Sequence, residues 1–180
     1  FIYVSENVIG SESECVRHEI IAKALTITAK DQSLMYGTSI STELNQVTVS
    51  GLVGTDALDS VTLTQNKTNV SNDGKVTASE AVIKNGTSVV TGNYNISYVQ
   101  GDLTITAKNV TPVISSCSDK AYDGTNSATC TLGAVSEKVG SDSVSVKLGT
   151  CTFNNATVGE EKAVTCTGIS ISGNDSSKYT

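Results

Sequence analysis

Five cysteines are the residues in this sequence whose type and spacing point most clearly to chemistry. Cys117, Cys130, Cys151 and Cys166 lie within one stretch of the chain. None of them forms a Cys-x-x-Cys pair and the chain has a single histidine, so a zinc site is the weaker interpretation of this cluster. A disulfide framework, which is typical of proteins in oxidising compartments, is the stronger interpretation.

Each pair of neighbouring cysteines flanks a predicted turn. Cys117 and Cys130 lie on either side of the Tyr122 turn, and Cys151 and Cys166 flank the next turn in the same way. We therefore favour the disulfides 117–130 and 151–166, each joining facing strands of a hairpin. Four cysteines allow three connectivities, and the other two stay open. Closing a loop of about 15 residues contributes about 3 kcal/mol in the chain-entropy model.

Catalysis by an activated nucleophile would have to use His18, because it is the only histidine. It sits among Glu12, Glu14 and Glu19, which is typical of a solvated strand edge. We therefore predict that the protein is not an enzyme. Cys15, nearby, is the odd cysteine: it is either a buried free thiol or a link to another chain or to one of the other four.

Carboxylates gather in predicted turns, but their spacing does not match a calcium-binding loop of the D-x-D-x-D-G type. Glycoside hydrolysis would need a cleft with aromatic platforms, and the chain has six Tyr, two Phe and no Trp. We therefore predict neither a metal nor a cofactor, and interpret these carboxylates as turn residues. They are Asp56, Asp59, Asp73, Asp119, Asp123, Asp142 and Asp175.

The composition of the 180 residues favours a folded, polar-surfaced β protein. Ser and Thr number 24 each, aromatic residues make up 4% and charged residues 17%. The net charge of −6 opposes binding to nucleic acid or to an anionic membrane surface. No apolar run approaches the roughly 20 residues that a bilayer span needs, so membrane insertion is excluded as well.

Strand patterns are dense and helical patterns are absent. Apolar and polar residues alternate with a period of two in six segments, and Gly- or Asn-containing turns separate these segments at intervals typical of a β-sandwich. Segment 79–84 is predicted as strand or turn. The six segments are 25–28, 47–49, 61–64, 89–90, 94–99 and 103–105.

An internal repeat divides the chain. The hexapeptide LTITAK occurs at 25–30 and again 78 residues later at 103–108, and each copy is followed by a tyrosine turn, at Tyr36 and at Tyr122. We interpret these two tyrosines as core or corner residues whose hydroxyls bond the backbone. The repeat predicts two homologous units in tandem, joined by short linkers into a semi-rigid rod.

The second unit lacks counterparts to the closing strands of the first. Joining Tyr179-Thr180 to Phe1-Ile2-Tyr3-Val4 gives a sequence that matches the Tyr-x-apolar-x-Tyr-Val pattern of 94–99. Phe1 also opens within a strand-like run that has neither a start methionine nor a leader pattern. We therefore expect an array cut at an arbitrary phase. Residues 1–23 would be the closing strands of the preceding unit. Residues 24–107 would form a complete sandwich, and residues 108–180 a sandwich without its last strands. Phe1, Ile2, Tyr3, Val4 and Tyr179 form the expected strand-exchange segment.

Specific motifs give the two units a family resemblance. Residues 24–107, with ALTITAKD, MYGT and GNYNISYVQGDLTITAK, resemble the MBG repeats of bacterial surface proteins. Residues 108–180, with KAYDGTNSAT and GNDSSKYT, resemble the YDG domains of haemagglutinin-like adhesins. The resemblance implies an all-β chain of two tandem immunoglobulin-like sandwiches that act as stalk modules, and it carries no catalytic residues. The four clustered cysteines depart from the family pattern.

From these observations we expect a structural repeat module of a long extracellular adhesin or filament, secreted or attached to the cell surface. Its role would be reach, stiffness and self-association, with identical neighbouring repeats or subunits as partners. The alternative is a β-sandwich that binds a glycan or a host-surface ligand. Exposed, grouped tyrosines would favour the binding function, and buried tyrosines would favour the stalk.

Overall fold

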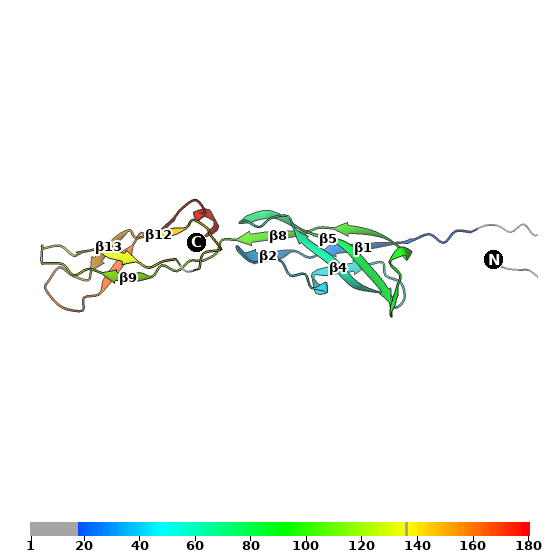
Figure 1. The fold of residues 1–180 in the computed structure, drawn as a ribbon, viewed down its shortest axis with the longest axis horizontal. Helices are drawn as coiled ribbons and strands as arrows, with labels where there is room; N and C mark the ends of the chain where they lie inside the picture. The colour runs from blue at the N-terminus through cyan, green and yellow to red at the C-terminus, as the bar shows by residue number, and fades with distance from the viewer. Residues whose placement is uncertain (1–17, 136) are drawn as a thin grey trace, which may run out of the picture.

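The computed structural model describes residues 18–135 and 137–180, and their regular structure is all-β. In these ranges the only helical elements are three short 3-10 turns, and none of them is long and apolar enough to cross a membrane. The sheets form two groups that follow one another along the longest axis of the molecule, an N-terminal half of residues 23–106 and a C-terminal half of residues 108–180 (Figure 1).

The N-terminal half contains two sheets. One has the order β3-β1-β7, with β1 and β7 parallel, and the other has the order β2-β8-β5-β4, with β2 and β8 parallel and β6 added to β5. Their elements are β1 (Lys23–Ala29), β2 (Gln32–Met35), η1 (Leu44–Gln46), β3 (Val47–Ser50), β4 (Ala57–Gln65), β5 (Ser71–Asn85), β6 (Ser88–Val89), η2 (Thr91–Asn93), β7 (Tyr94–Val99) and β8 (Gly101–Thr106).

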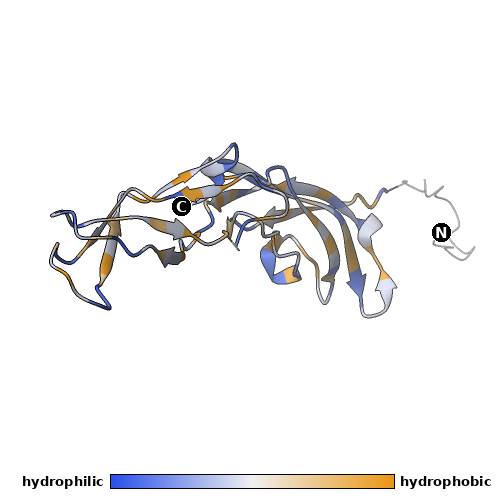
Figure 2. Cartoon of the chain, turned by 60° about the vertical axis from the view of Figure 1, so that its left-hand side comes forward, coloured by the Kyte–Doolittle hydropathy of each residue, from blue (hydrophilic) through white to orange (hydrophobic). Residues whose placement is uncertain are grey.

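The core of this half follows from the period-two pattern of its strands. Alternate residues of β1, β5 and β8 point inward, and the most buried side chains are Leu25, Ile27, Val76, Ile83 and Leu103. Figure 2 shows apolar and polar residues interspersed along the strands of the molecule. The six predicted strands all coincide with strands of this half, and 79–84 is strand, as part of β5.

The repeated hexapeptide does not mark equivalent positions. At 25–30 it forms β1, the first strand of the half, whereas at 103–108 it forms most of β8, the last strand. Both copies bury alternate residues, so their patterns cannot distinguish the two positions. The structural repeat is longer: Lys23 pairs with Tyr94 in parallel, and Lys108 pairs with Tyr179 in the same way.

The C-terminal half repeats part of this arrangement with smaller sheets. Its pairings are β10-β13-β14, β11-β9 and β12-β15. Strand pairs of the two halves correspond when 88 is added to the residue numbers. The β4–β5 pair Leu63↔Ala78 then matches the β13–β14 pair Cys151↔Cys166, and the β4–β5 pair Leu58↔Ile83 matches the β12–β15 pair Val146↔Ile171. The elements are β9 (Ile114–Cys117), β10 (Ser127–Ala128), β11 (Cys130–Leu132), β12 (Ser145–Lys147), β13 (Thr150–Phe153), β14 (Val164–Thr167), β15 (Ser170–Ser172) and η3 (Ser176–Lys178).

The two ends of the described chain lie in different surroundings. Residues 18–22 form no strand and lead away from β1, with Ile20 fully exposed and Ile21 79% exposed. Thr180 lies at the boundary between the halves, where its backbone bonds Lys108 and Val110. The predicted strand at Phe1–Val4 lies outside the described residues.

Leu103 tests the proposed core directly. It is fully buried in β8, so Leu103→Ala should lower the free energy of unfolding by about 2–5 kcal/mol through lost burial and a residual cavity. Leu44→Ala is the control, because Leu44 is 43% exposed and should change stability by less than about 1 kcal/mol. Urea unfolding measures both. Equal effects would show that β8 does not lie in the core.

Candidate functional site

The boundary between the two halves is built around a pair of tyrosines. Tyr36 directly follows β2 in the N-terminal half, and Tyr179 directly follows η3 in the C-terminal half. Both are buried, and their rings meet edge to face with centroids 5.7 Å apart and planes at 81°. This is a favoured geometry for aromatic pairs. We call the Tyr36, Asp142, Lys178 and Tyr179 contacts the joint.

One carboxylate receives both tyrosine hydroxyls. Tyr36 Oη donates to Asp142 Oδ2 at 2.9 Å, and Tyr179 Oη donates to the same oxygen at 2.7 Å. Burial, together with this bond to Asp142, raises the pKa of the Tyr179 hydroxyl, so it stays protonated and a donor at physiological pH. Hydrogen bonds to a charged acceptor are stronger than neutral ones, and here they join residues from the two halves.

The loop that carries Asp142 also holds Tyr179 in place. The backbone N–H of Val139 donates to Tyr179 Oη at 2.7 Å, and Gly140 turns the chain with a φ of +51°. The turn after Tyr36 packs directly on this loop, since a Cβ added to Gly37 would lie 2.5 Å from Val139 Cγ2. A side chain at position 37 would therefore separate the halves.

Lys178 adds a charge to the joint. Its ammonium lies 5.1 Å from the centroid of the Tyr36 ring, 2.8 Å from Asp175 Oδ1 and 3.6 Å from Asp142 Oδ1. The bond to Asp175 raises the pKa of Lys178, and Lys178 in turn lowers the pKa of Asp175. The cation therefore neutralises the acidic loop and contacts the tyrosine face at the same time.

The same hydroxyl and carboxylate arrangement occurs at the other end of the N-terminal half. Val53 N–H donates to Tyr94 Oη at 3.1 Å, and Tyr94 Oη donates to Asp56 Oδ2 at 2.5 Å. The bond to Asp56 raises the pKa of the Tyr94 hydroxyl, and burial raises it further. The loops that supply the valine N–H and the aspartate at the two places lie 86 residues apart. They are Val53-Gly54-Thr55-Asp56 and Val139-Gly140-Ser141-Asp142. We call the first loop and Tyr94 the N-terminal socket.

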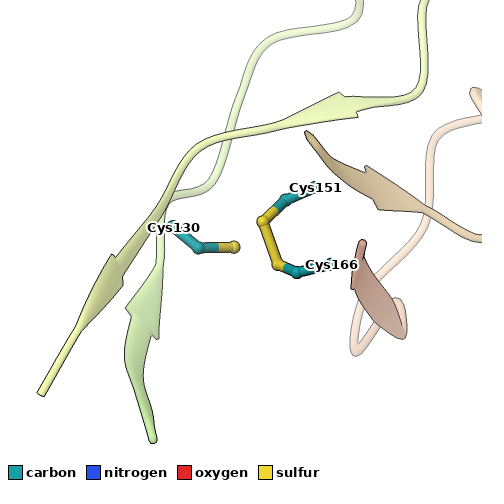
Figure 3. Close-up of side chains that lie close together, drawn as sticks. All are labelled: Cys130, Cys151 and Cys166. Carbon is teal, nitrogen blue, oxygen red and sulfur yellow. A yellow bond between two sulfur atoms is a disulfide. The ribbon is translucent and has the colours of Figure 1, made fainter. Parts of the chain in front are cut away.

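Two disulfides brace the C-terminal half. The structure joins Cys117 to Cys130, between β9 and β11, and Cys151 to Cys166, between β13 and β14, the same two pairs that the turn spacing favours. The sulfurs of Cys130, Cys151 and Cys166 lie within 4.8 Å of one another, so the two disulfides are neighbours (Figure 3). Only the reduced thiolates could bind a metal such as zinc, and in the disulfide form they cannot.

A groove of about 640 Å³ lies at the end of the C-terminal half that points away from the joint. One wall is the segment 117–122 and the other is 155–162, with Phe153 and Val164 also contributing. Tyr122 at its rim is 70% exposed and Val158 is 86% exposed. The turn beside Tyr122 is ordered by Asp123, whose pKa falls to about 2 because Lys120 and Thr125 bond its carboxylate.

Sequence reasoning located the tyrosines but assigned their surroundings incorrectly. The interpretation of Tyr122 as a core tyrosine is wrong, because its turn lies at an exposed tip. Tyr36 is buried, but its hydroxyl bonds a carboxylate of the other half rather than backbone. The tyrosines that accept a backbone N–H are Tyr94, Tyr98 and Tyr179.

Of the other predicted site residues, one lies in the joint and the rest lie outside the described residues. Tyr179, expected in the strand-exchange segment, is buried in the joint, while Phe1, Ile2, Tyr3, Val4 and Cys15 lie outside the described residues. Sequence reasoning missed the role of Asp142 and Lys178. The recurrence of Val-Gly-Thr-Asp as Val-Gly-Ser-Asp is the signal that could have identified the carboxylate.

Comparison with known families confirms both resemblances. The family model for the MBG domain (YGX type) matches residues 25–104, and the model for the YDG domain matches residues 106–180. Neither a curated protein nor a solved structure matches the chain.

The disulfides predict the number of reactive thiols. Because Cys117, Cys130, Cys151 and Cys166 are paired, denatured but unreduced protein should take up at most one alkylating group per chain, at Cys15. Intact mass spectrometry before and after reduction counts these groups. Four or five alkylated cysteines before reduction would contradict the framework and would place the protein in a reducing compartment.

Proposed function

We propose that this chain, in which an MBG domain at residues 25–104 is followed by a YDG domain at 106–180, is a structural repeat module of a long extracellular bacterial adhesin or filament. In this proposal both domains are immunoglobulin-like sandwiches, and the module contributes reach, stiffness and self-association. Two disulfides support an oxidising, extracellular location, either secreted or at the cell surface.

The joint is the observation that carries the proposal. The MBG domain ends with β8 at Thr106, and Lys108 already pairs with Tyr179 of the YDG domain, so Ala107 is the whole linker. Tyr36, Asp142 and Lys178 then fix the rotation of one domain about the other. A module with a one-residue linker and a buried, charged contact transmits length along its axis instead of folding at a hinge.

The groove supports self-association by strand addition. In the MBG domain β8 lies between β2 and β5. Segments 117–122 and 159–164 of the YDG domain correspond to β2 and to the first part of β5, because Tyr122 matches Tyr36 and Val164 matches Val76. Residues of both segments line the groove. The groove therefore has the position that suits an added strand.

Residues 1–22 of a neighbouring copy are the proposed occupant. The dipeptide Ala-Lys occurs at 22–23, where the MBG domain begins, and again at 107–108, where the YDG domain begins. Aligning these two dipeptides places Ile20 opposite Ile105 of β8. Ile105 is 2% exposed, whereas Ile20 is fully exposed. Insertion of this segment would bury Ile20 and complete the YDG sandwich, as the next repeat of one chain or as a separate subunit.

A glycan or host ligand is the second candidate for the same groove. Tyr122 and Phe153 line it together with Asp119 and Asn155, which offer hydrogen-bonding groups. The strand is favoured, because the two walls match the strands that flank β8. Three of the five described tyrosines are buried and the two more exposed ones, Tyr98 and Tyr122, lie in different domains, so the tyrosines do not form an aromatic platform.

A rigid joint predicts a single orientation of the two domains. Amide residual dipolar couplings from residues 25–104 and 108–180 should fit one alignment tensor. Gly37→Val should separate the tensors, because the new side chain would overlap Val139.

Gly92→Ala is the control, since an added Cβ there meets no atom within 4 Å, and it should keep the single tensor. Two independent tensors in the unaltered protein would refute the stiff module.

Strand addition predicts hydrogen exchange in a protein of two consecutive copies. Apart from Ser118, whose amide already bonds the carbonyl of Thr129, amides of segments 117–120 and 159–164 in the first copy should exchange roughly tenfold or more slowly than in a single copy, because the second copy's strand would bond them. Ile20→Asp in the second copy should abolish this protection, while Glu19→Gln should not. Equal exchange in one and two copies would rule out completion by a neighbour and leave the groove to a ligand.

A further inference from the structure

The joint inside this chain provides a template for contacts between copies. It has two parts: a tyrosine on a turn, Tyr36, and a socket made of Asp142, Tyr179 and the Val139 N–H. Each part has a counterpart elsewhere in the chain. The N-terminal socket repeats the second part at the start of the MBG domain, and the exposed Tyr122 turn repeats the first part at the far end of the YDG domain.

The N-terminal socket matches the occupied one in its hydrogen bonds and register. In both, a valine N–H donates to the tyrosine hydroxyl, which donates to an aspartate Oδ2. In both, the tyrosine pairs in parallel with the lysine that begins the domain, Lys23 or Lys108. The two ends of the module therefore share one contact chemistry.

The N-terminal socket retains room and bonding capacity. Val53 is 53% exposed, whereas its counterpart Val139 is packed against Gly37 and partly buried. Asp142 Oδ2 accepts two hydroxyls, whereas among the described residues Asp56 Oδ2 accepts the hydroxyl of Tyr94 alone, and Asn85 bonds its other oxygen. A carboxylate oxygen has two acceptor lone pairs, so Asp56 can accept a second tyrosine hydroxyl.

The Tyr122 turn is prepared to fill such a socket. Tyr122 follows the segment that corresponds to β2, as Tyr36 follows β2, and a Gly-Thr pair comes soon after each. Lys120, Asp123 and Thr125 hold the turn in place and leave the ring 70% exposed. The turn differs in one respect, since Asp123 separates the tyrosine from its glycine, so the packing of Gly37 on Val139 need not be copied.

We propose that Tyr122 of one copy enters the N-terminal socket of the next, with its hydroxyl donating to Asp56 Oδ2 beside Tyr94. The partner is a second copy of this chain, and the inference rests on the proposed repeat-module function. Strand addition by residues 1–22 would bring the two surfaces together, because that segment leads directly into Lys23 at the socket. Every domain boundary of the array would then be closed by a tyrosine on an aspartate.

The test uses one copy and two consecutive copies, both labelled with 3-fluorotyrosine, and follows the ¹⁹F resonance of Tyr122. Tyr122→Phe in the single copy, or in the first copy of the two-copy protein, assigns this resonance. In the single copy it should have the chemical shift of a solvent-exposed ring, since Tyr122 is 70% exposed. In the two-copy protein the resonance of the first copy's Tyr122 should move away from that shift, because the ring would lie against Tyr94 and its hydroxyl would donate to Asp56.

Asp56→Asn in the second copy should return that resonance to its single-copy shift, whereas Asp59→Asn, a neighbouring exposed carboxylate, should not. An unchanged Tyr122 resonance in two copies would overturn the proposal. Hydrogen exchange on the same sample separates the two failures. Protected segments 117–120 and 159–164 with a free Tyr122 would refute only this contact, and unprotected segments would refute the array itself.

Discussion

The structure depends on one carboxylate shared between two domains. Asp142 accepts the hydroxyls of Tyr36 and Tyr179 within a largely buried contact, and removing its carboxylate would leave the Tyr36 hydroxyl without its acceptor. Hydrogen bonds have narrow distance and angle requirements, so this arrangement fixes a rotation that apolar packing alone would leave loose. The single-residue linker and the close contact of Gly37 with Val139 add to this restraint.

The two domains reach stability by different routes. In the MBG domain Leu63 and Ala78 form a buried cross-strand pair, and the YDG domain has the disulfide Cys151–Cys166 at the corresponding place. Among the described residues, the buried apolar side chains lie mostly in the MBG domain, and the YDG domain contributes Val110, Cys151 and Tyr179. A small core is commonly supplemented by covalent links, which explains why the four paired cysteines lie in this unit.

The period-two patterns were sufficient to predict the all-β class and strands of the N-terminal half, whereas the short strands of the C-terminal half were not predicted one by one. The turn spacing favoured both disulfides. The role of the tyrosines could not be predicted, because Tyr36 and Tyr122 occupy similar sequence contexts and differ only in whether another domain covers them. The LTITAK copies also misled the alignment of the repeat. Strands β1 and β8 both bury alternate residues, so their sequences converge although their positions in the sheets differ.

In the proposed array, two kinds of domain boundary would alternate. One is the joint within each copy, and the other is its proposed counterpart between consecutive copies. The most direct measurement is a crystal structure of two consecutive copies. The account predicts that residues 1–22 of the second copy lie between segments 117–122 and 159–164 of the first, with Tyr122 against Asp56. A structure in which those residues fold onto their own MBG domain, with the two copies unrelated in orientation, would contradict it.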